Sequence, residues 1–146
     1  MYHYRECGLP NVYLANGYRE IETPHGRGVA IEDVHGLYKV IAKELVNTKP
    51  VLSGPEVKFI RKFLALTQAQ FAHLLGVEAQ SVRRWEKLPR APRQADRSVR
   101  LMARDILRDI DLPMEKLLEK LTKAHAPKRY QYRHRDSDWL PVREAA

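Results

Sequence analysis

Three cations stand close together in one short stretch of the chain, Arg83, Arg84 and Lys87. Guanidinium and ammonium groups at this density neutralise phosphates, so the stretch is a candidate for binding nucleic acid. The alternative is a solvated helix face that binds nothing. The choice between the two depends on the charge and on the elements around the stretch.

The net charge of the chain is concentrated around these cations. Lys and Arg number 26 against 18 Asp and Glu, which gives a formal charge of +8 and a pI near 9.7. Residues 53–94 hold eight cationic and three acidic residues, whereas residues 1–52 and 95–122 each hold six of either sign. Residues 123–146 hold six cationic and three acidic residues, so most of the surplus lies in residues 53–94. A surplus concentrated in one short block is typical of a surface that faces phosphate.

Catalytic and metal-binding patterns do not stand out in the sequence. Cys7 is the only cysteine, and its spacing from His3, His25 and His35 matches no paired-ligand zinc motif. Two pairs of neighbouring carboxylates are expected to be exposed charges and not an acid and its base: Glu20 with Glu22, and Glu32 with Asp33. We therefore expect no metal, no cofactor and no enzymatic activity.

Two helix-start signals precede the cationic stretch. Ser53 with Glu56 and Thr67 with Gln70 have the spacing of capping boxes. They predict helices that begin near residues 54 and 68, and Gly76 is expected to end the second helix in a left-handed conformation.

The next residues predict a third helix, at about residues 79–87, which prolines at 89 and 92 prevent from continuing. Ala72 provides a small side chain where two helices cross, Gly76 allows a tight turn, and Val82 and Trp85 face back onto the preceding helix. This spacing is typical of a helix-turn-helix unit, which presents its second helix to the major groove of DNA. The alternative is a helical hairpin packed in a core.

The first 50 residues predict a small module of a β-hairpin and a helix. Asn16-Gly17 stands between two apolar runs, which predicts a type I′ turn joining two strands over residues 12–21. Helical spacing begins after Asp33 and stops near Asn47. Because this module is near neutral and rich in tyrosine, it suits a contact with protein more than one with DNA.

The residues after the prolines predict two further helices and a tail. Apolar periodicity places the helices at about residues 95–110 and 111–121. The charged residues here are expected to balance one another at the surface: Arg97, Arg100, Arg104 and Arg108 with Asp96, Asp105 and Asp109. The alternative is that these arginines form a second clamp for phosphate. Residues 123–146 are basic and aromatic without clear periodicity, so we expect a poorly ordered end, with an arm that follows DNA or a partner protein as the alternative. The expected domains are 1–50, 51–122 and 123–146.

The stretch from Leu66 to Glu86 resembles a known family. Its two parts, LTQAQFAHLLGV and SVRRWE, are similar to the XRE-type, lambda-repressor-like helix-turn-helix of bacterial and phage repressors. The resemblance implies a mainly α fold, a five-helix DNA-binding domain preceded by the hairpin-plus-helix module. The whole chain is similar to small regulators of the antitoxin type, including MqsA-like ones, although it lacks the zinc-binding cysteine pairs of their N-terminal domain.

The resemblance also implies roles for single residues. Gln68, at a helix N-terminus, would hold a DNA phosphate. Ala79, Gln80 and Arg84 would point at base edges, where the carboxamide suits adenine and the guanidinium suits guanine. The remaining polar residues of the third helix would lie beside a phosphate or a neighbouring base: Ser81, Arg83 and Lys87.

Three more residues are compared with the family pattern. Arg61 and Glu86 match a structural ion pair between the first and third helices of the unit. Glu78 stands where the family usually has Ser or Thr; its carboxylate is able to cap the helix but would repel a close phosphate.

These observations together predict a sequence-specific DNA-binding transcriptional regulator, a repressor that binds a palindromic operator as a homodimer. The dimer contact would come from the N-terminal module or from the helices after Ala95. The alternative is an antitoxin that neutralises a cognate toxin protein and represses its own operon. No apolar run has the length of a membrane helix and the N-terminus lacks the apolar stretch of a signal peptide, so we expect a cytoplasmic protein with no membrane partner.

Overall fold

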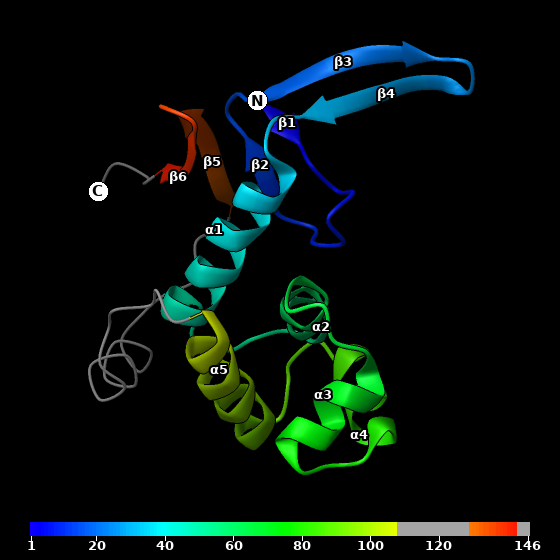
Figure 1. Cartoon of the computed structure of the whole chain (residues 1–146), viewed down its shortest axis with the longest axis vertical. Helices are drawn as coiled ribbons and strands as arrows, with labels where there is room; N and C mark the ends of the chain where they lie inside the picture. Colours follow the sequence, from blue (N-terminus) through cyan, green and yellow to red (C-terminus); the bar gives the residue numbers. More distant parts are fainter. Residues whose placement is uncertain (108–128, 143–146) are drawn as a thin grey trace. The chain divides into compact units, whose positions relative to one another are not determined.

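Strands from both ends of the chain form one sheet. The computed structural model describes residues 1–107 and 129–142 (Figure 1). Four strands hydrogen bond in the order β1-β2-β5-β6, with β2 and β5 parallel and the other neighbours antiparallel. Their bounds are Tyr2–His3 for β1, Val12–Leu14 for β2, Tyr130–Arg135 for β5 and Asp138–Val142 for β6.

The expectation of a poorly ordered tail is wrong for residues 129–142, which contain β5 and β6. Buried Tyr130 and Tyr132 alternate with the more exposed Gln131 and Arg133, which is the period of a half-buried strand. The parallel partner, β2, lies at the other end of the sequence, so no local signal announces the pairing. The helix expected at residues 111–121, Arg108 and Asp109 lie outside the described residues.

The expected hairpin over residues 12–21 is also wrong. β2 does not pair with β3 (Tyr18–Thr23), which instead forms a separate two-stranded sheet with β4 (Gly26–Ile31). The turn of this hairpin is at Pro24-His25. The side chain of Asn16 hydrogen bonds the backbone of β5. Its Nδ2 donates to the His134 carbonyl at 3.1 Å, and its Oδ1 accepts from the His134 amide at 2.5 Å.

Gly17 has the left-handed backbone conformation expected of a glycine in a type I′ turn. In the structure this conformation does not form the turn of a hairpin, and the absent side chain instead leaves space for a neighbouring ring. The φ of Gly17 is +77°, and a Cβ there would overlap the indole ring of Trp139. The indole N–H of Trp139 donates to the carbonyls of Glu32, at 2.8 Å, and Asp33, at 3.1 Å. The Asn16-Gly17 pair therefore connects the two sheets and leaves room for a buried tryptophan.

Five helices follow in the described residues, and the caps predicted at Ser53, Thr67 and Gly76 are confirmed. α1 (Val34–Thr48) begins after Asp33, whose Oδ1 accepts from the amide of Gly36 at 3.1 Å. Both capping boxes form, at the starts of α2 (Gly54–Phe63) and α3 (Gln68–Leu75), and Gly76 ends α3 with φ +73°. α4 (Ala79–Glu86) and α5 (Arg93–Leu107) agree with the predicted periodicity.

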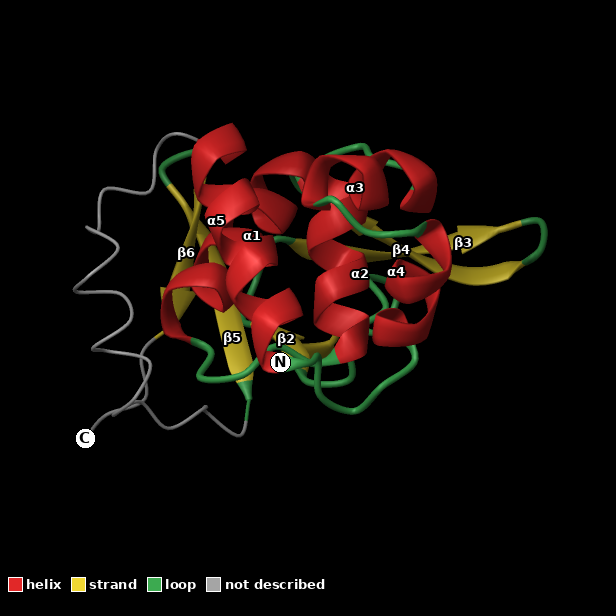
Figure 2. Cartoon of the chain, turned by 90° about the horizontal axis from the view of Figure 1, so that it is seen from below, coloured by secondary structure: helices red, strands yellow, loops and turns green. Residues whose placement is uncertain are grey.

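The chain divides into two units. The first contains residues 1–40 together with β5 and β6, and the second runs from Ile41 to the end of α5 within the described residues. In the second unit α2, α3, α4 and α5 pack as one group (Figure 2) around buried apolar side chains. These include Ile60, Phe71, Val82 and Val99, none of which has any exposed surface. This core fixes α4 against α3 and α2.

The expected fold class, a mainly α lambda-repressor-like fold with a small hairpin-plus-helix module, is wrong. In the described residues six strands in two sheets accompany five helices. The sequence motif covers the helices of the second unit alone, and the periodicity of the remaining residues was too short to predict the mixed sheet. Two of its four strands have only two or three residues.

Candidate nucleic-acid interface

α4 is held in place by a tight turn and a buried inner face. The left-handed Gly76 allows the Val77 amide to donate to the Ala72 carbonyl at 2.9 Å, which ends α3 and turns the chain into α4. Ala72 is buried at 2% exposure where the helices approach. Val82 and Trp85 turn inward from α4 and bury their side chains in the core of the unit. The four residues expected to shape the turn are thus brought together.

The outer face of α4 is polar and cationic. A surface hollow of about 520 Å³ is lined by Glu78, Gln80, Ser81, Arg83, Arg84 and Lys87. Of these, Gln80, Arg83, Arg84 and Lys87 are exposed and Ser81 is half-buried. Five of the seven residues that the family resemblance connects with DNA therefore share one surface. Ala79 is half-buried at the first turn of α4, and Gln68 lies on α3.

The inner end of α4 carries the ion pair that the resemblance implied. The Arg61 Nε donates to Glu86 Oε2 at 2.7 Å and Nη2 donates to Oε1 at 3.1 Å, a two-pronged contact between α2 and α4. The third donor, Arg61 Nη1, reaches the carbonyl of Leu66 at 2.8 Å. Both side chains are more than nine-tenths buried. The contact fixes the end of α4 relative to α2 and to the start of α3.

Gln68 joins the same group. Its Nε2 donates to Glu86 Oε1 at 3.1 Å, so one of the two amide hydrogens is used inside the protein. A carboxamide nitrogen has two hydrogens, and the second is available to an outside acceptor. The structure thus separates Gln68 from the hollow on α4 but connects it to α4 through Glu86.

Glu78 does not cap α4. It is the N-cap residue, yet its side chain makes no capping hydrogen bond. The carboxylate is exposed and lines the hollow beside the cations. The sequence analysis allowed a capping role for Glu78. In the structure Glu78 instead places a negative charge at the edge of the cationic surface.

Gly54 also positions α4, a role that was not predicted for it. The Gly54 amide donates to the carbonyl of Leu88 at 2.9 Å, and a Cβ at Gly54 would overlap the backbone at the end of α4. Glu56, besides its capping role, accepts two hydrogen bonds from Lys49 Nζ at 2.9 and 3.0 Å. A glycine inside a capping box, S-G-P-E, was the available signal for the close approach.

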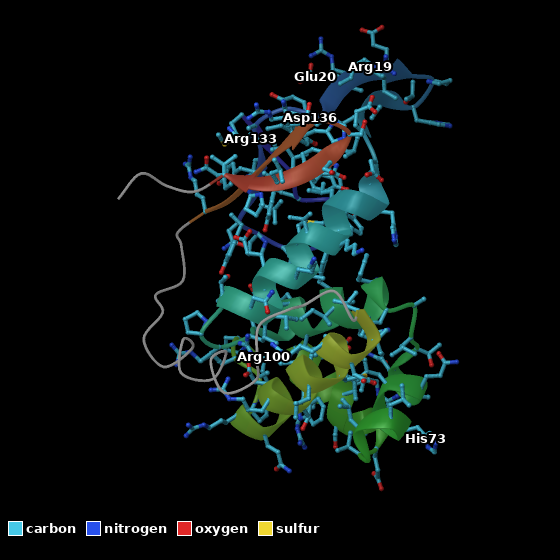
Figure 3. All side chains as sticks on the ribbon, turned by 60° about the vertical axis from the view of Figure 1, so that its left-hand side comes forward. Arg19, Glu20, His73, Arg100, Arg133 and Asp136 are labelled. Atoms are coloured by element: carbon cyan, nitrogen blue, oxygen red, sulfur yellow. The ribbon has the colours of Figure 1, made fainter. Side chains whose placement is uncertain are left out.

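The expectation that the charged residues of α5 lie at the surface is wrong for Arg100, labelled in Figure 3, and for Asp96, which are 1% and 2% exposed. It donates to the carbonyls of Leu45, Val46 and Lys49 at the end of α1 and to both carboxylate oxygens of Asp96. Buried arginine is tolerated because all five N–H groups have acceptors. Arg97 also pairs with Asp96, at 2.7 Å.

Comparison of the chain with protein-family models, with curated proteins and with solved structures finds no match to any of them. Among the described residues, no helix is both long enough and apolar enough to cross a membrane, and no three His, Cys, Asp or Glu side chains gather as a metal would require.

Proposed function

We propose that this protein is a sequence-specific DNA-binding transcriptional regulator, a repressor, that places α4 in the major groove of DNA. The observation that carries the proposal is the division of α4 into two faces. Val82, Trp85 and Glu86 are buried, whereas the polar and cationic residues line one outward hollow. An α-helix with such a face has the size and charge to enter the major groove.

The side chains on this face suit both parts of DNA recognition. Arg84 and Gln80 provide a guanidinium and a carboxamide, the groups that pair with guanine and adenine edges respectively. Arg83 and Lys87 provide the charge that neutralises phosphates, and Gln68 has one remaining amide hydrogen for a phosphate at the start of α3. The proposal places the protein in the cytoplasm and gives it a homodimeric form on a palindromic operator.

Selection of bound sequences from random duplexes tests the proposal. The expected result is a site with two-fold symmetry, whose affinity changes by about 1–3 kcal/mol when one contacted base pair is altered. Recovery of sequences without a common motif, bound with strong salt dependence, would contradict sequence-specific regulation and leave only phosphate attraction.

A second candidate function is that of an antitoxin that binds a toxin protein and represses its own operon. The β3–β4 hairpin favours it, because every residue of both strands is exposed or half-exposed. Within the described residues neither outer edge of the hairpin pairs with another strand, so both edges have backbone groups for a protein partner.

The antitoxin candidate is tested on the protein encoded by the neighbouring gene. We expect the purified pair to bind with nanomolar affinity in calorimetry, and Val29→Pro, which removes one backbone donor of β4, to weaken the complex while DNA affinity is unchanged. Absence of heat with the neighbouring protein would leave the repressor function alone.

A further inference from the structure

One surface of the second unit is apolar and uncovered by any described residue. It lies between α3 and α5, where Leu74, Leu101 and Ile106 are 57%, 53% and 44% exposed. With Leu75 and Met102 they line a hollow of about 480 Å³, which is separate from the hollow on α4. Large apolar side chains gathered on one surface mark a site of contact with another molecule.

We infer that this surface binds the same surface of a second copy of the chain, with a two-fold axis that passes beside Leu101. The charges on α5 support this choice. Arg97 and Asp105 stand four residues before and four residues after Leu101, about 6 Å away along the helix in either direction. When two α5 helices cross antiparallel at Leu101, Arg97 of each copy faces Asp105 of the other.

Both charges are available for such a contact. Asp105 is exposed, and the side chain of Arg97 is 28% exposed. Arg97 uses Nη1 for Asp96, which leaves its other N–H groups for the carboxylate of the second copy. The apolar side chains between the two charges then pack against their own symmetry mates, in the manner of an isologous interface.

The two opposite charges, Arg97 and Asp105, favour a second copy of the chain over a partner protein of uniform charge. A uniformly acidic partner would place a negative charge against Asp105, and a basic partner would place a positive charge against Arg97. A self-complementary partner satisfies both charges at once. The interface depends on this surface alone, whereas its role in joining two α4 helices on a palindrome rests on the proposed function.

Light scattering of the full chain tests the inference first. The chain has a mass of 17.0 kDa, and we expect the wild type at micromolar concentration to scatter as twice that mass and Leu101→Glu to scatter as one chain. Leu140→Glu is the matched control, because it makes the same change on an exposed leucine of β6 and should remain dimeric. A wild type that scatters as one chain overturns the inference.

Charge reversal tests the symmetry. Arg97→Glu and Asp105→Arg should each weaken the dimer at least tenfold, because like charges then face each other twice. An equimolar mixture of the two variants should recover dimers, since the introduced glutamate of one variant meets the introduced arginine of the other. Circular dichroism checks that Arg97→Glu, which adds a charge beside Asp96, remains folded. Two single variants that dimerise like the wild type, or a mixture that stays monomeric, overturn the proposed register.

A cross-link at the axis provides a readout that does not need destabilising variants. In a Cys7→Ser background, Leu101→Cys should form a disulfide-linked dimer under mild oxidation, whereas Lys58→Cys on α2 should not. If Leu101→Cys forms no disulfide-linked dimer, the inference is overturned, because the surface is then not in contact with a second copy.

DNA binding by the monomeric variant keeps the two proposals distinguishable. Leu101→Glu should bind a single half-site as the wild type does and lose at least tenfold in affinity for the full palindrome. If no variant binds DNA while the dimer tests succeed, the proposed function fails and the interface stands. If DNA binding is specific but the wild type is monomeric, the interface fails and the DNA-binding function stands.

Discussion

The guanidinium of Arg61 contacts the carboxylate of Glu86 at two points, with distances of 2.7 and 3.1 Å, and so connects α2 to the end of α4. Both groups are buried, and Glu86 immediately follows Trp85 at the end of α4. The position of the cationic face thus depends on a buried charge pair that does not line the hollow on that face.

Removal of one partner of this pair should destabilise the protein strongly. Arg61→Met leaves Glu86 buried and unbalanced, so we expect the free energy of unfolding to fall by about 3–5 kcal/mol. Arg61→Met with Glu86→Leu should lose less than Arg61→Met alone, because no buried charge remains. Urea denaturation measures both, with Lys62→Met, an exposed neighbour, as the control. Equal losses in the single and double variants would contradict the coupling.

Arg84→Ala should lower the affinity for the selected operator by about 1–3 kcal/mol and relax the preference at one base pair. The reason is the loss of a two-pronged contact with guanine. Arg19→Ala on β3, an exposed arginine of the other unit, is the control and should leave affinity unchanged. Fluorescence anisotropy with single-base operator variants provides the measurement, and an unchanged base preference would exclude Arg84 from base recognition.

Glu78→Ser should strengthen DNA binding. The carboxylate at the start of α4 makes no capping bond and lines the same hollow as Arg83 and Arg84, where it would repel a DNA phosphate under the proposed function. Its removal is worth about 0.3–1 kcal/mol, or about two- to fivefold in affinity at low salt. The same anisotropy assay checks it, and Glu20→Ser on β3 controls for the change in net charge. A loss of affinity would show that Glu78 contacts DNA or its ordered water.

Arg100→Lys should destabilise the protein although the charge is kept. Arg100 donates five hydrogen bonds, to three carbonyls at the end of α1 and to both oxygens of Asp96, whereas lysine has three donors. Acceptors left without a donor should cost about 2 kcal/mol or more in total. Thermal unfolding measures the loss, with Arg93→Lys at the exposed start of α5 as the control. If Arg100→Lys melted at the same temperature as the wild type, the five hydrogen bonds of the Arg100 guanidinium would not contribute to stability.

Tyr2 and Glu6 should make the first unit sensitive to pH at both extremes. The Tyr2 hydroxyl donates to Glu6 Oε1 at 2.5 Å, and this hydrogen bond, with burial and the nearby carboxylates, raises the pKa of Tyr2 to about 12. The raised pKa of Tyr2 stabilises the folded protein, and this contribution is fully present below the pKa that the same tyrosine has in the unfolded chain. It is lost as the pH rises toward 12. Burial and the hydrogen bond with Tyr38 also raise the pKa of Tyr4. Absorbance at 295 nm should therefore detect more than one late-titrating tyrosine, and the one that titrates near pH 12 should disappear in Tyr2→Phe.

The pKa of Glu6, the partner of Tyr2, is lowered, so its effect on stability has the opposite dependence on pH. Burial acts to raise its pKa, but the hydrogen bond from Tyr2 and nearby backbone donors lower it overall. Its contribution to stability is therefore present above the pKa of an unfolded glutamate and lost as pH falls through the lowered value. Glu6→Gln should remove this acid dependence and bring the Tyr2 titration to lower pH. A Tyr2 titration that Glu6→Gln leaves in place would contradict the assigned bond.

The helices around α4 were predictable because their signals are local. A capping box, a glycine after an apolar run and a proline each act within one or two turns, so Ser53, Thr67 and Gly76 fixed element boundaries without reference to the rest of the chain. The cations of α4 were visible in the sequence itself, whereas the Arg61–Glu86 pair was implied by the family resemblance.

The sheets, and the partners of several polar residues, were decided by tertiary structure. Val12 pairs with Tyr130 across almost the whole chain, and a strand of three residues has too few positions to show a period. The same limit applies to Asn16, whose dipeptide with Gly17 predicts a hairpin but whose amide instead bonds His134. Arg100 looked like a surface charge because Asp96, four residues earlier on the same helix, was its visible partner, and only folding brings the carbonyls at the end of α1 around it. Sequence thus determined what each segment forms by itself, and long-range packing determined which segments meet.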